Sequence, residues 1–276
     1  MATARAKAAE TMRKTELVIE VLDARAPHAS CNPGFETLRR AGQRPALKVL
    51  NKADLADAAE TERWLRFYNA KKDVRAISVS AKQPGAMRRL VRACQELRPD
   101  RGTVVKPLRM MILGVPNVGK STLMNALLQR HVAHVGDEPA ITKVQMYHDL
   151  APGMSLVDTP GMLWPGMDED TAFKLAATHS IGRAAYDDQD VALSLGRTLV
   201  ARYRALLDRR FGVLPAGCDA HGLLEAIAAV RHFVAKQGGP DLARAAGTLL
   251  NDFRSGALGP ITLETVDELP ASAPDP

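Results

Sequence analysis

The sequence has few cysteines. Its 276 residues include three, Cys31, Cys94 and Cys218, and none of them belongs to a Cys-x-x-Cys pair. An odd number without that spacing argues against a disulfide framework and against a zinc site. Such cysteine usage is typical of a reducing compartment, so we expect a cytoplasmic protein.

Long hydrophobic runs are also missing. No apolar stretch approaches the ~18 residues of a membrane-spanning helix, so we expect no integral membrane association. The opening residues MATARAKAAE lack the apolar segment of a secretory signal. An organellar transit peptide is the weaker interpretation of this Arg-bearing start, because Glu10 and a strand pattern follow soon after. The choice between a bacterial cytosol and a mitochondrial matrix stays open.

The composition is that of a folded protein. Hydrophobic residues make up 46% and charged residues 25%, both near the globular average. A chain of 276 residues is long enough for one α/β domain and a smaller companion. The excess of 37 Lys and Arg over 31 Asp and Glu gives a net charge of +6, which suits an anionic partner such as RNA or simply a solubilising surface.

Five short apolar runs predict β-strands, at residues 17–24, 45–54, 74–81, 108–114 and 154–161. They are mostly unalternating, and helix-like stretches such as 57–72 and 85–98 separate them. That pattern is typical of a parallel sheet covered on both faces, and therefore of a doubly wound α/β fold.

Beyond about residue 170 the strand signals fade and Ala-rich helical patterns follow, at 194–212, 221–239 and 241–259. Gly238 and Gly239 supply a stop for the second of them. The last residues are acidic and Pro-rich with little to bury. We therefore expect a nucleotide-binding domain at 1–170, a helical domain at 171–265 and a disordered tail at 266–276.

The stretch GVPNVGKS, residues 114–121, fits the phosphate-binding pattern G-x-x-x-x-G-K-S/T between an apolar strand and a helix. Backbone N–H groups of such a loop bind phosphates, Lys120 neutralises the outer ones, and Ser121 offers its hydroxyl to Mg²⁺. The residues expected to contact the nucleotide here are Asn117, Val118, Gly119, Lys120, Ser121 and Thr122.

A second phosphate-sensing motif is DTPG, residues 158–161, at the end of the last apolar strand. Asp158 can hold Mg²⁺ through water, and the Gly161 N–H can reach a γ-phosphate. Between the two motifs, Thr142 is the natural switch threonine that completes the shell of metal and water, although an ordinary loop role competes. Lys120 and Thr142 are our candidate catalytic residues.

The motif NKAD, residues 51–54, predicts guanine recognition. Asp54 can accept two N–H bonds from the guanine edge, Asn51 can meet acceptors of the ring, Ala53 lies between the contacting residues, and the stem of Lys52 can lie over the base. Adenine would leave the buried carboxylate unpaired, so the motif selects GTP over ATP. In SVSAK, residues 78–82, Ser80 and Ala81 form a turn whose Ala81 N–H can bond the guanine oxygen.

The guanine motif precedes the phosphate loop, which reverses the usual order. A nucleotide site depends on where loops at the carboxyl ends of strands meet, not on their order in the chain. The polar segment 98–109, with its Gly and Pro, looks like the join of the former chain ends. With VLDARAPHASCNP, NKADL, GVPNVGKST and DTPGMLWP, the chain resembles the circularly permuted GTPases of the YlqF/RbgA ribosome-assembly family and its mitochondrial relatives, from residue 1 to about 265.

The resemblance implies a P-loop GTPase that binds GTP, GDP and Mg²⁺ and hydrolyses GTP slowly, stimulated by a partner. It also implies action in assembly of the large ribosomal subunit, with contacts to rRNA and ribosomal proteins, none to DNA, and a monomeric state. The residues after DTPG run into the helical domain, so nucleotide state can move that domain. Its basic residues, available for rRNA or merely solvated, are Arg202, Arg204, Arg209, Arg210, Arg231, Lys236, Arg244 and Arg254.

Catalysis is less well specified than binding. Met162 stands where small GTPases carry a water-orienting Gln, and a thioether cannot polarise water. The resemblance implies a catalytic His in a Gly-His-Met stretch whose Met matches Met1, so that His is not in the sequence given; His28 is a conceivable stand-in. Asn117 either ligates a K⁺ ion or suits a turn.

A GTP-dependent binding module without hydrolysis is the alternative function. A third function, that of a P-loop ATPase or kinase, is opposed by the NKAD motif.

Overall fold

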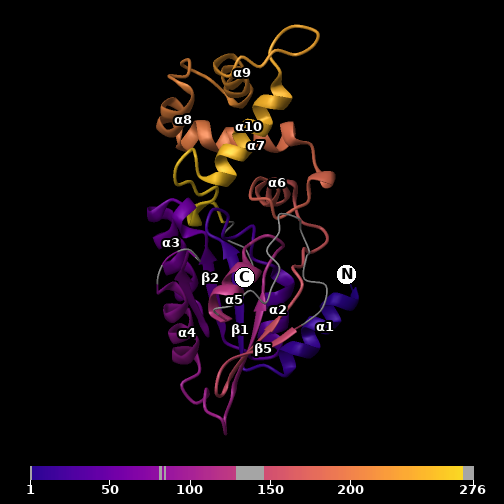
Figure 1. Cartoon of the computed structure of the whole chain (residues 1–276), viewed down its shortest axis with the longest axis vertical. Helices are drawn as coiled ribbons and strands as arrows, with labels where there is room; N and C mark the ends of the chain where they lie inside the picture. The colour runs from indigo at the N-terminus through magenta and orange to yellow at the C-terminus, as the bar shows by residue number, and fades with distance from the viewer. Residues whose placement is uncertain (1, 81–82, 84, 129–145, 270–276) are drawn as a thin grey trace. The chain divides into compact units, whose positions relative to one another are not determined.

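The computed structural model describes residues 2–80, 83, 85–128 and 146–269. The chain forms two compact units. Unit 1 comprises residues 1–165 together with 264–276, and unit 2 comprises 166–263. Figure 1 shows strands and helices in the first and helices in the second.

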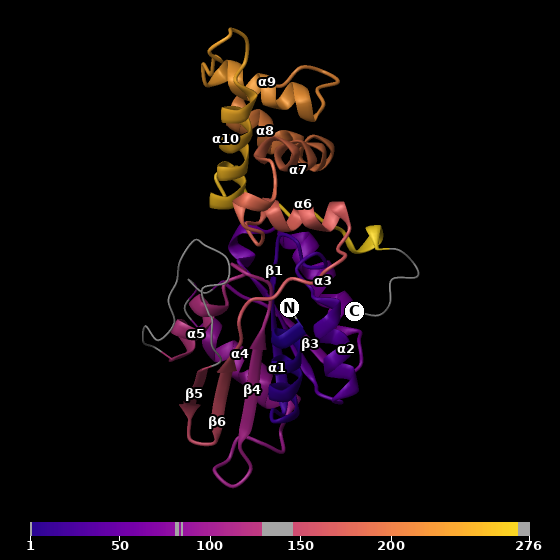
Figure 2. The ribbon, with the colours of Figure 1, turned by 90° about the vertical axis from the view of Figure 1, so that its right-hand side faces the viewer.

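Unit 1 is built on a six-stranded sheet with the strand order β3-β2-β1-β4-β6-β5, seen in Figure 2. All neighbouring strands are parallel except β5 and β6, which are antiparallel. The strands are β1 (Leu17–Asp23), β2 (Ala46–Asn51), β3 (Val74–Ser78), β4 (Leu108–Leu113), β5 (Met146–Ala151) and β6 (Met154–Asp158).

The five predicted strands and the doubly wound α/β class are confirmed, but β5 was missed. Its sequence, MYHDLA, places His148 and Asp149 in mid-strand and so breaks the apolar pattern. An edge strand has a neighbour on one side only and needs no continuous apolar run. The sheet is therefore mixed, with one antiparallel edge strand.

Helix α3 (Ala58–Asn69) covers one face of the sheet beside β1, β2 and β3. Its side chains Trp64 and Tyr68 are fully buried in one cluster with Leu22 and Leu50 of the strands. The helix begins at Asp57, whose carboxylate accepts the N–H of Ala59 at 2.8 Å. Expectation and structure agree on this helix.

The same face continues under α1 (Ala2–Arg13) and α2 (Pro33–Ala41), which the sequence interpretation did not identify. Met12 of α1 and Phe35 of α2 pack in one cluster with Val18 and Met111 of the strands. Asn32 caps α2 by accepting the N–H of Gly34, and Pro33 occupies its first turn. Helix α2 has only nine residues, which weakens any periodic signal. Helix α1 is as long as α3, but its sequence ATARAKAAETMR carries only one large apolar residue and so shows no clear apolar face.

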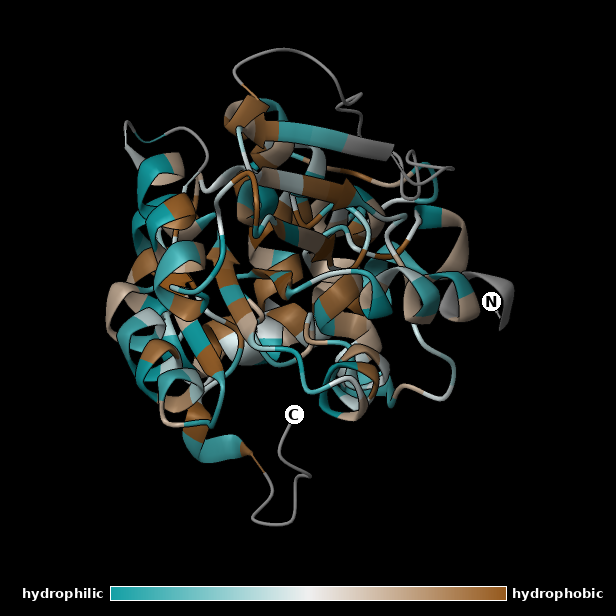
Figure 3. Cartoon of the chain, turned by 90° about the horizontal axis from the view of Figure 1, so that it is seen from below, coloured by the Kyte–Doolittle hydropathy of each residue, from teal (hydrophilic) through white to brown (hydrophobic). Residues whose placement is uncertain are grey.

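The opposite face is covered by α4 (Ala86–Leu97) and α5 (Lys120–Leu128). Successive strand side chains point to opposite faces, so the alternate residues belong here. These strand residues are fully buried: Ile19, Val21, Leu47 and Val49. Figure 3 shows hydrophobic residues gathered on the central strands and hydrophilic ones on the outward turns of the surrounding helices.

The chain returns to unit 1 at Glu264. The Glu264 carboxylate accepts the N–H groups of His28 at 2.7 Å and Ala29 at 3.0 Å, and its backbone carbonyl accepts the indole N–H of Trp64 at 3.2 Å. A short 3-10 helix, η3 (Val266–Glu268), follows.

The expectation of a disordered tail from residue 266 is wrong for its first part. Val266 and Leu269 pack against the cluster around Trp64, so these two apolar residues do find a surface to bury against. Residues 270–276 lie outside the described part of the chain.

Unit 2 consists of helices in its described residues. The elements are α6 (Glu169–Ala177), η2 (Arg183–Ala185), α7 (Asp188–Arg202), α8 (Arg204–Phe211), α9 (Ala220–Val230) and α10 (Leu242–Ser255). An aspartate caps the N-terminus of α6, α7, α9 and α10 alike. The core joins buried residues of the five α-helices, including Leu199, Ile227 and Leu249.

Two helical expectations need correction. The pattern at 194–212 is divided between α7 and α8, because Tyr203 departs from helical backbone with φ −128°. Helix α9 ends at Val230 and not at Gly238. The residues after it form a turn closed by a bridge between Val234 and Pro240, and the two glycines serve that turn.

Candidate nucleotide-binding site

The phosphate loop connects β4 to α5, and its two glycines allow close approach of neighbouring groups. Gly114 has φ +151°, and a Cβ there would lie 2.5 Å from the carbonyl oxygen of Val21. Gly119 has φ +103°, and a Cβ there would lie 2.2 Å from the side-chain nitrogen of Asn51. The loop is therefore packed against the ends of β1 and β2, where only glycine fits.

Lys120 begins α5 and is 7% exposed. Its Nζ donates to the carbonyl oxygens of Gly114 at 3.0 Å and Val115 at 2.8 Å. Burial lowers the pKa of Lys120 to about 8, while the nearby Asp158 carboxylate opposes the shift. The ammonium group thus lies inside the curve of the loop, where a phosphate oxygen would be its natural acceptor.

The guanine motif follows β2 and is bonded directly to the phosphate loop. Asn51 donates from Nδ2 to the carbonyl oxygen of Val118 at 2.9 Å. Lys52, in left-handed backbone with φ +59°, donates from Nζ to the carbonyl oxygen of Asn117 at 2.9 Å. The reversed motif order therefore does not prevent the two motifs from meeting.

Asp54 lies on the short 3-10 helix η1 (Ala53–Leu55), and its side chain is exposed. The buried carboxylate assumed in the sequence argument for GTP over ATP is therefore not found in this structure. The N–H of Ala53 bonds the carbonyl oxygen of Val79, which fixes this turn to the end of β3. Ser80, in the second guanine segment, is buried. Ala81 lies outside the described residues.

The DTPG motif lies against the phosphate loop. A Cβ at Gly161 would be 2.9 Å from both Nζ of Lys120 and Cα of Pro116. Thr159 donates to the carbonyl oxygen of Ile112 at 2.7 Å, and Asp158 at the end of β6 is 2% exposed. Thr142 lies outside the described residues.

The remaining loop residues follow one another on α5. Ser121 is half-buried beside Lys120, and Thr122 is exposed. The described residues contain no group of three or more His, Cys, Asp or Glu placed to bind a metal ion together. A hydroxyl from Ser121 and a carboxylate from Asp158 are nevertheless hard oxygen ligands of the kind that Mg²⁺ prefers, because this ion needs only one or two protein groups besides water and phosphate.

Met162 does not present its side chain as a catalytic group. The thioether packs against the cluster that holds Met12 and Phe35. The backbone carbonyl accepts the side-chain N–H of Asn32 at 3.2 Å, and the backbone N–H bonds Gly114 at 3.4 Å. The residue thus fastens the segment after DTPG to α2 and to the phosphate loop.

His28 is also held in a structural setting. Its ring stacks on Trp64 at a centroid distance of 6.4 Å, and its backbone N–H donates to Glu264. Nothing in this arrangement directs the imidazole at the phosphate loop, so the structure gives no support to a catalytic role.

Sequence reasoning missed two buried charged residues beside the guanine motif, Asp23 and Arg25. Asp23 is fully buried at the end of β1, and its carboxylate accepts bonds from Arg25 and Lys52. The signal was available in VLDARAP, where an acidic and a basic residue directly follow an apolar strand.

The eight basic residues of unit 2 named as available for rRNA divide into three groups. Arg202 is half-buried, with its guanidinium 5.5 Å from the centroid of the Tyr203 ring. Arg204 bonds the carbonyl oxygens of Leu214 and Pro215, Arg210 pairs with Asp252, and Arg254 bonds the end of α6. Those with exposed side chains and no carboxylate bonded to them in any described contact are Arg209, Arg231, Lys236 and Arg244.

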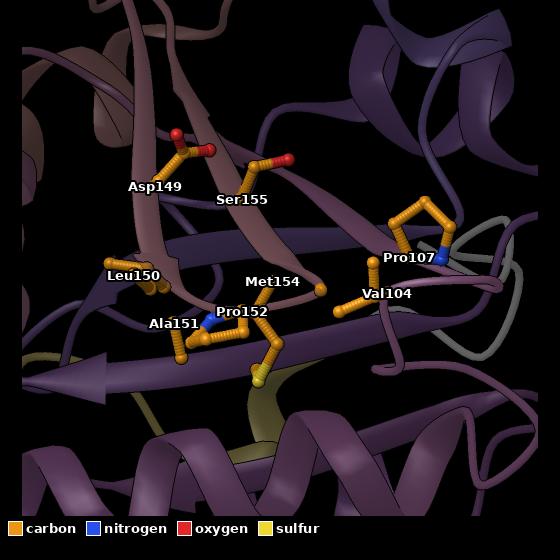
Figure 4. A pocket seen from close by; sticks show the side chains of 9 residues that line it. Val104, Pro107, Asp149, Leu150, Ala151, Pro152, Met154 and Ser155 are labelled. Carbon is orange, nitrogen blue, oxygen red and sulfur yellow. The ribbon is translucent and has the colours of Figure 1, made fainter.

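Two cavities lie away from these motifs. One, of about 570 Å³, is lined by Val104, Pro107 and the β5–β6 turn, shown in Figure 4. The other, of about 720 Å³, is lined by residues at the ends of α2, α3 and α4, among them Arg40 and Lys72. No motif residue lines either one.

Comparisons with known proteins agree with the site. Residues 109–199 match a family described as 50S ribosome-binding GTPase. Ribosome biogenesis GTPase A of Bacillus cereus is 34% identical over 97% of this chain and 92% of its own length. Mitochondrial ribosome-associated GTPase 1 of Bos taurus is 31% identical over 96% of this chain and 86% of its own length.

Solved structures are similar over nearly the whole chain. A GDP-bound structure of TM YlqF matches with a TM-score of 0.68 and 26% identity, covering 95% of this chain and all of the other. A GNP-bound YlqF from T. maritima matches with a TM-score of 0.66 and 26% identity, covering 97% of this chain and all of the other. Among the described residues, no helix is both long and apolar enough to cross a bilayer.

Proposed function

The chain belongs to the ribosome biogenesis GTPase A family, and from that membership we propose that it is a slow GTPase switch in assembly of the large ribosomal subunit. The observation that carries the proposal is the pair of bonds from Asn51 to Val118 and from Lys52 to Asn117. They join the guanine motif and the phosphate loop in one site, so a single nucleotide can contact both.

Base recognition is assigned to the guanine motif. Asp54 is exposed at this site and has the two acceptor oxygens that the N–H groups of guanine require. The side-chain oxygen of Asn51 is buried and has no hydrogen-bond partner among the described residues, whereas its nitrogen is bonded to the loop. The second hydrogen of the Asn51 amide nitrogen can still be donated to an acceptor of the guanine ring, which is the contact predicted from the sequence.

Phosphate binding is assigned to the loop and to Lys120, which would exchange its two carbonyl acceptors for phosphate oxygens. Ser121 and Asp158 fit Mg²⁺, with Thr142 as the proposed third group. When bound, the ion neutralises charge on the phosphate oxygens. Asn117 has φ +53°, a backbone conformation that asparagine adopts readily, so a turn role accounts for it without a potassium ion.

The partner-dependent rate follows from Met162. Its partly buried thioether packs against a core cluster of unit 1 and cannot polarise water, so no side chain at the position after Gly161 orients the attacking water. A partner that supplies or positions such a group would accelerate hydrolysis. The same observation favours the alternative function, a GTP-dependent binding module with negligible hydrolysis.

Contacts to rRNA are assigned to the exposed basic residues Arg209, Arg231, Lys236 and Arg244 of unit 2. We propose a monomer that acts where ribosomes are assembled, in a bacterial cytoplasm or a mitochondrial matrix. Arg204, Arg210 and Arg254 are dropped from the expected RNA-contacting set, because intramolecular bonds occupy them.

Turnover measurements with and without ribosomal particles test the proposal. We expect large subunits to raise GTP hydrolysis by about a hundredfold, the lower range for a positioned acid–base group, and small subunits to have no such effect. GTP-dependent binding to large subunits without any increase in hydrolysis would favour the binding module. Absence of binding to either particle would contradict the ribosomal role.

A titration tests the phosphate-binding role of Lys120. In the nucleotide-free protein we expect the ¹³Cε NMR signal of Lys120 to titrate near pH 8, since burial lowers its pKa to about 8. Bound GDP should raise that pKa, because phosphate stabilises the charged form. GDP affinity should consequently fall as pH rises above 8. The signal is assigned by its loss in Lys120→Met, and an unchanged midpoint with GDP would contradict the assignment.

A further inference from the structure

We propose that Asp23 is a positioning residue of the nucleotide site, which holds the ammonium group of Lys52 so that the lysine stem is ready to lie along the guanine plane. The inference rests on the proposed function, because Lys52 is assigned to the base there. It adds a residue outside the NKAD, phosphate-loop and DTPG motifs.

The sheet brings Asp23 to the guanine motif. Asp23 is the last residue of β1 and lies opposite Asn51, the last residue of β2, in the parallel register. Its backbone N–H donates to Ser30 at 3.0 Å, and that hydroxyl in turn donates to Ala26 at 2.6 Å. The position of the Asp23 side chain is therefore fixed by the strand and by the loop that follows it.

Both carboxylate oxygens of Asp23 are occupied. Arg25 donates to Oδ1 from Nε and to Oδ2 from Nη2, each at 2.9 Å, and its backbone N–H donates to Oδ1 at 3.1 Å. Lys52 donates to Oδ2 at 2.9 Å. Arg25 thus neutralises the buried carboxylate, and Lys52 is the partner that reaches the same carboxylate from the guanine motif.

Lys52 is fixed at both of its ends. Its backbone is left-handed, and its Nζ is shared between Asp23 and the carbonyl oxygen of Asn117 in the phosphate loop. A free lysine side chain loses rotamer entropy when it is fixed. Holding the ammonium group in advance removes much of that cost from nucleotide binding, which is preorganisation.

The directions of the pKa shifts of Asp23 and Lys52 agree with a carboxylate that holds the lysine. Burial alone would raise the pKa of Asp23, but Arg25 and Lys52 hold it well below its usual range. Burial lowers the pKa of Lys52, and Asp23 opposes that effect while Arg25 adds to it. Without the carboxylate, Lys52 would face a buried guanidinium, and its ammonium group would turn away from Asn117.

A double-mutant cycle tests the inference. GDP dissociation constants are measured for the wild type, Asp23→Asn, Lys52→Met and the double variant. We expect Asp23→Asn to weaken GDP binding roughly tenfold or more, and to have less than about a twofold effect when Lys52 is already methionine, as for directly coupled residues. Equal factors in the two backgrounds would overturn the proposal, because Asp23 would then act independently of Lys52.

Arg25→Met is the matched control. It removes the guanidinium but leaves the carboxylate next to Lys52, so we expect a lower melting temperature and a GDP affinity within about threefold of wild type, in keeping with contacts that only support the fold. A loss as large as that of Asp23→Asn would mean that the buried pair acts through folding alone. If Asp23→Asn does not fold, Asp23→Glu, which displaces the carboxylate by one methylene, enters the same cycle.

Base specificity separates this inference from the proposed function. A lysine stem stacks on any purine, so Asp23→Asn should weaken GDP binding to the wild type and XDP binding to Asp54→Asn by the same factor. If Asp54→Asn does not change base preference, the guanine site itself is wrongly assigned. If it does and the Asp23–Lys52 cycle shows no coupling, only the role of Asp23 is wrong.

Discussion

Replacing Lys120 with alanine is expected to weaken GTP binding by about a hundredfold or more, since charge-assisted bonds to phosphate contribute about 1.5–3 kcal/mol each. The side chain lies inside the phosphate loop and makes two carbonyl contacts that phosphate oxygens would replace. No neighbouring cation of the described loop can take over, because Lys52 is held by Asp23 and Asn117. Equilibrium binding of a fluorescent GTP analogue measures the loss.

The fold should survive this substitution. Burial depresses the pKa of Lys120, so the folded state binds that proton less tightly than the unfolded state does. The charged lysine therefore costs stability at pH values below about 8, and the cost declines as pH rises through 8. Lys106→Ala, an equal charge change at an exposed residue of the 98–109 segment, is the control. Equal effects of the two variants on GTP affinity would refute the phosphate-loop assignment.

The second large effect is expected from Asp54→Asn, which should reverse the preference between GTP and XTP. Xanthine presents an acceptor where guanine presents a donor, and an amide can donate to it while a carboxylate cannot. A site built around hydrogen bonds discriminates strongly, by up to ~10⁴-fold, against a base that leaves them unpaired. Competition between the two triphosphates for the wild type and the variant measures the change.

Asp57→Asn is the matched control for that experiment. It makes the same replacement three residues later, at the N-cap of α3, where the amide oxygen can still accept the N–H of Ala59. Base preference should therefore remain that of the wild type. A GTP preference that persists in Asp54→Asn would show that Asp54 does not read the base.

The elements that could be predicted are those whose own residues show the pattern of a strand or a helix. Strands β1 to β4 and β6 are short apolar runs, and Asp57 announces the start of α3. Strand β5 was missed because His148 and Asp149 interrupt its apolar pattern. The helix η3 was missed because its tail is Pro-rich and holds only two apolar residues that could be buried. Trp64, against which η3 packs, is distant in sequence and could be known only from the fold. Strand β6, in contrast, follows β5 directly after Pro152 and Gly153, a turn signal that the sequence interpretation did not use.

The site shows the same limit. The chemistry of the motifs 51–54, 114–121 and 158–161 could be predicted from the sequence, since each residue type matches one part of a nucleotide. Asp23 did not, because its importance depends on the register that sets it opposite Asn51. Met162 was identified as unable to orient water, but the reason for a methionine, its packing against Phe35, required the structure.

The return of the chain at Glu264 has a topological consequence. Unit 2 is an insertion in unit 1, with one crossing before Gly166 and another after Leu263, and not a C-terminal appendage. Cutting the backbone at one crossing leaves the two units covalently joined through the other. While unit 1 is folded, an unfolded unit 2 is a closed loop and not a free tail. Closing a loop of about a hundred residues reduces the entropy of the unfolded state, and this raises the free energy of that state by roughly 4 kcal/mol. The Glu264 bonds to His28 and Ala29 close that loop.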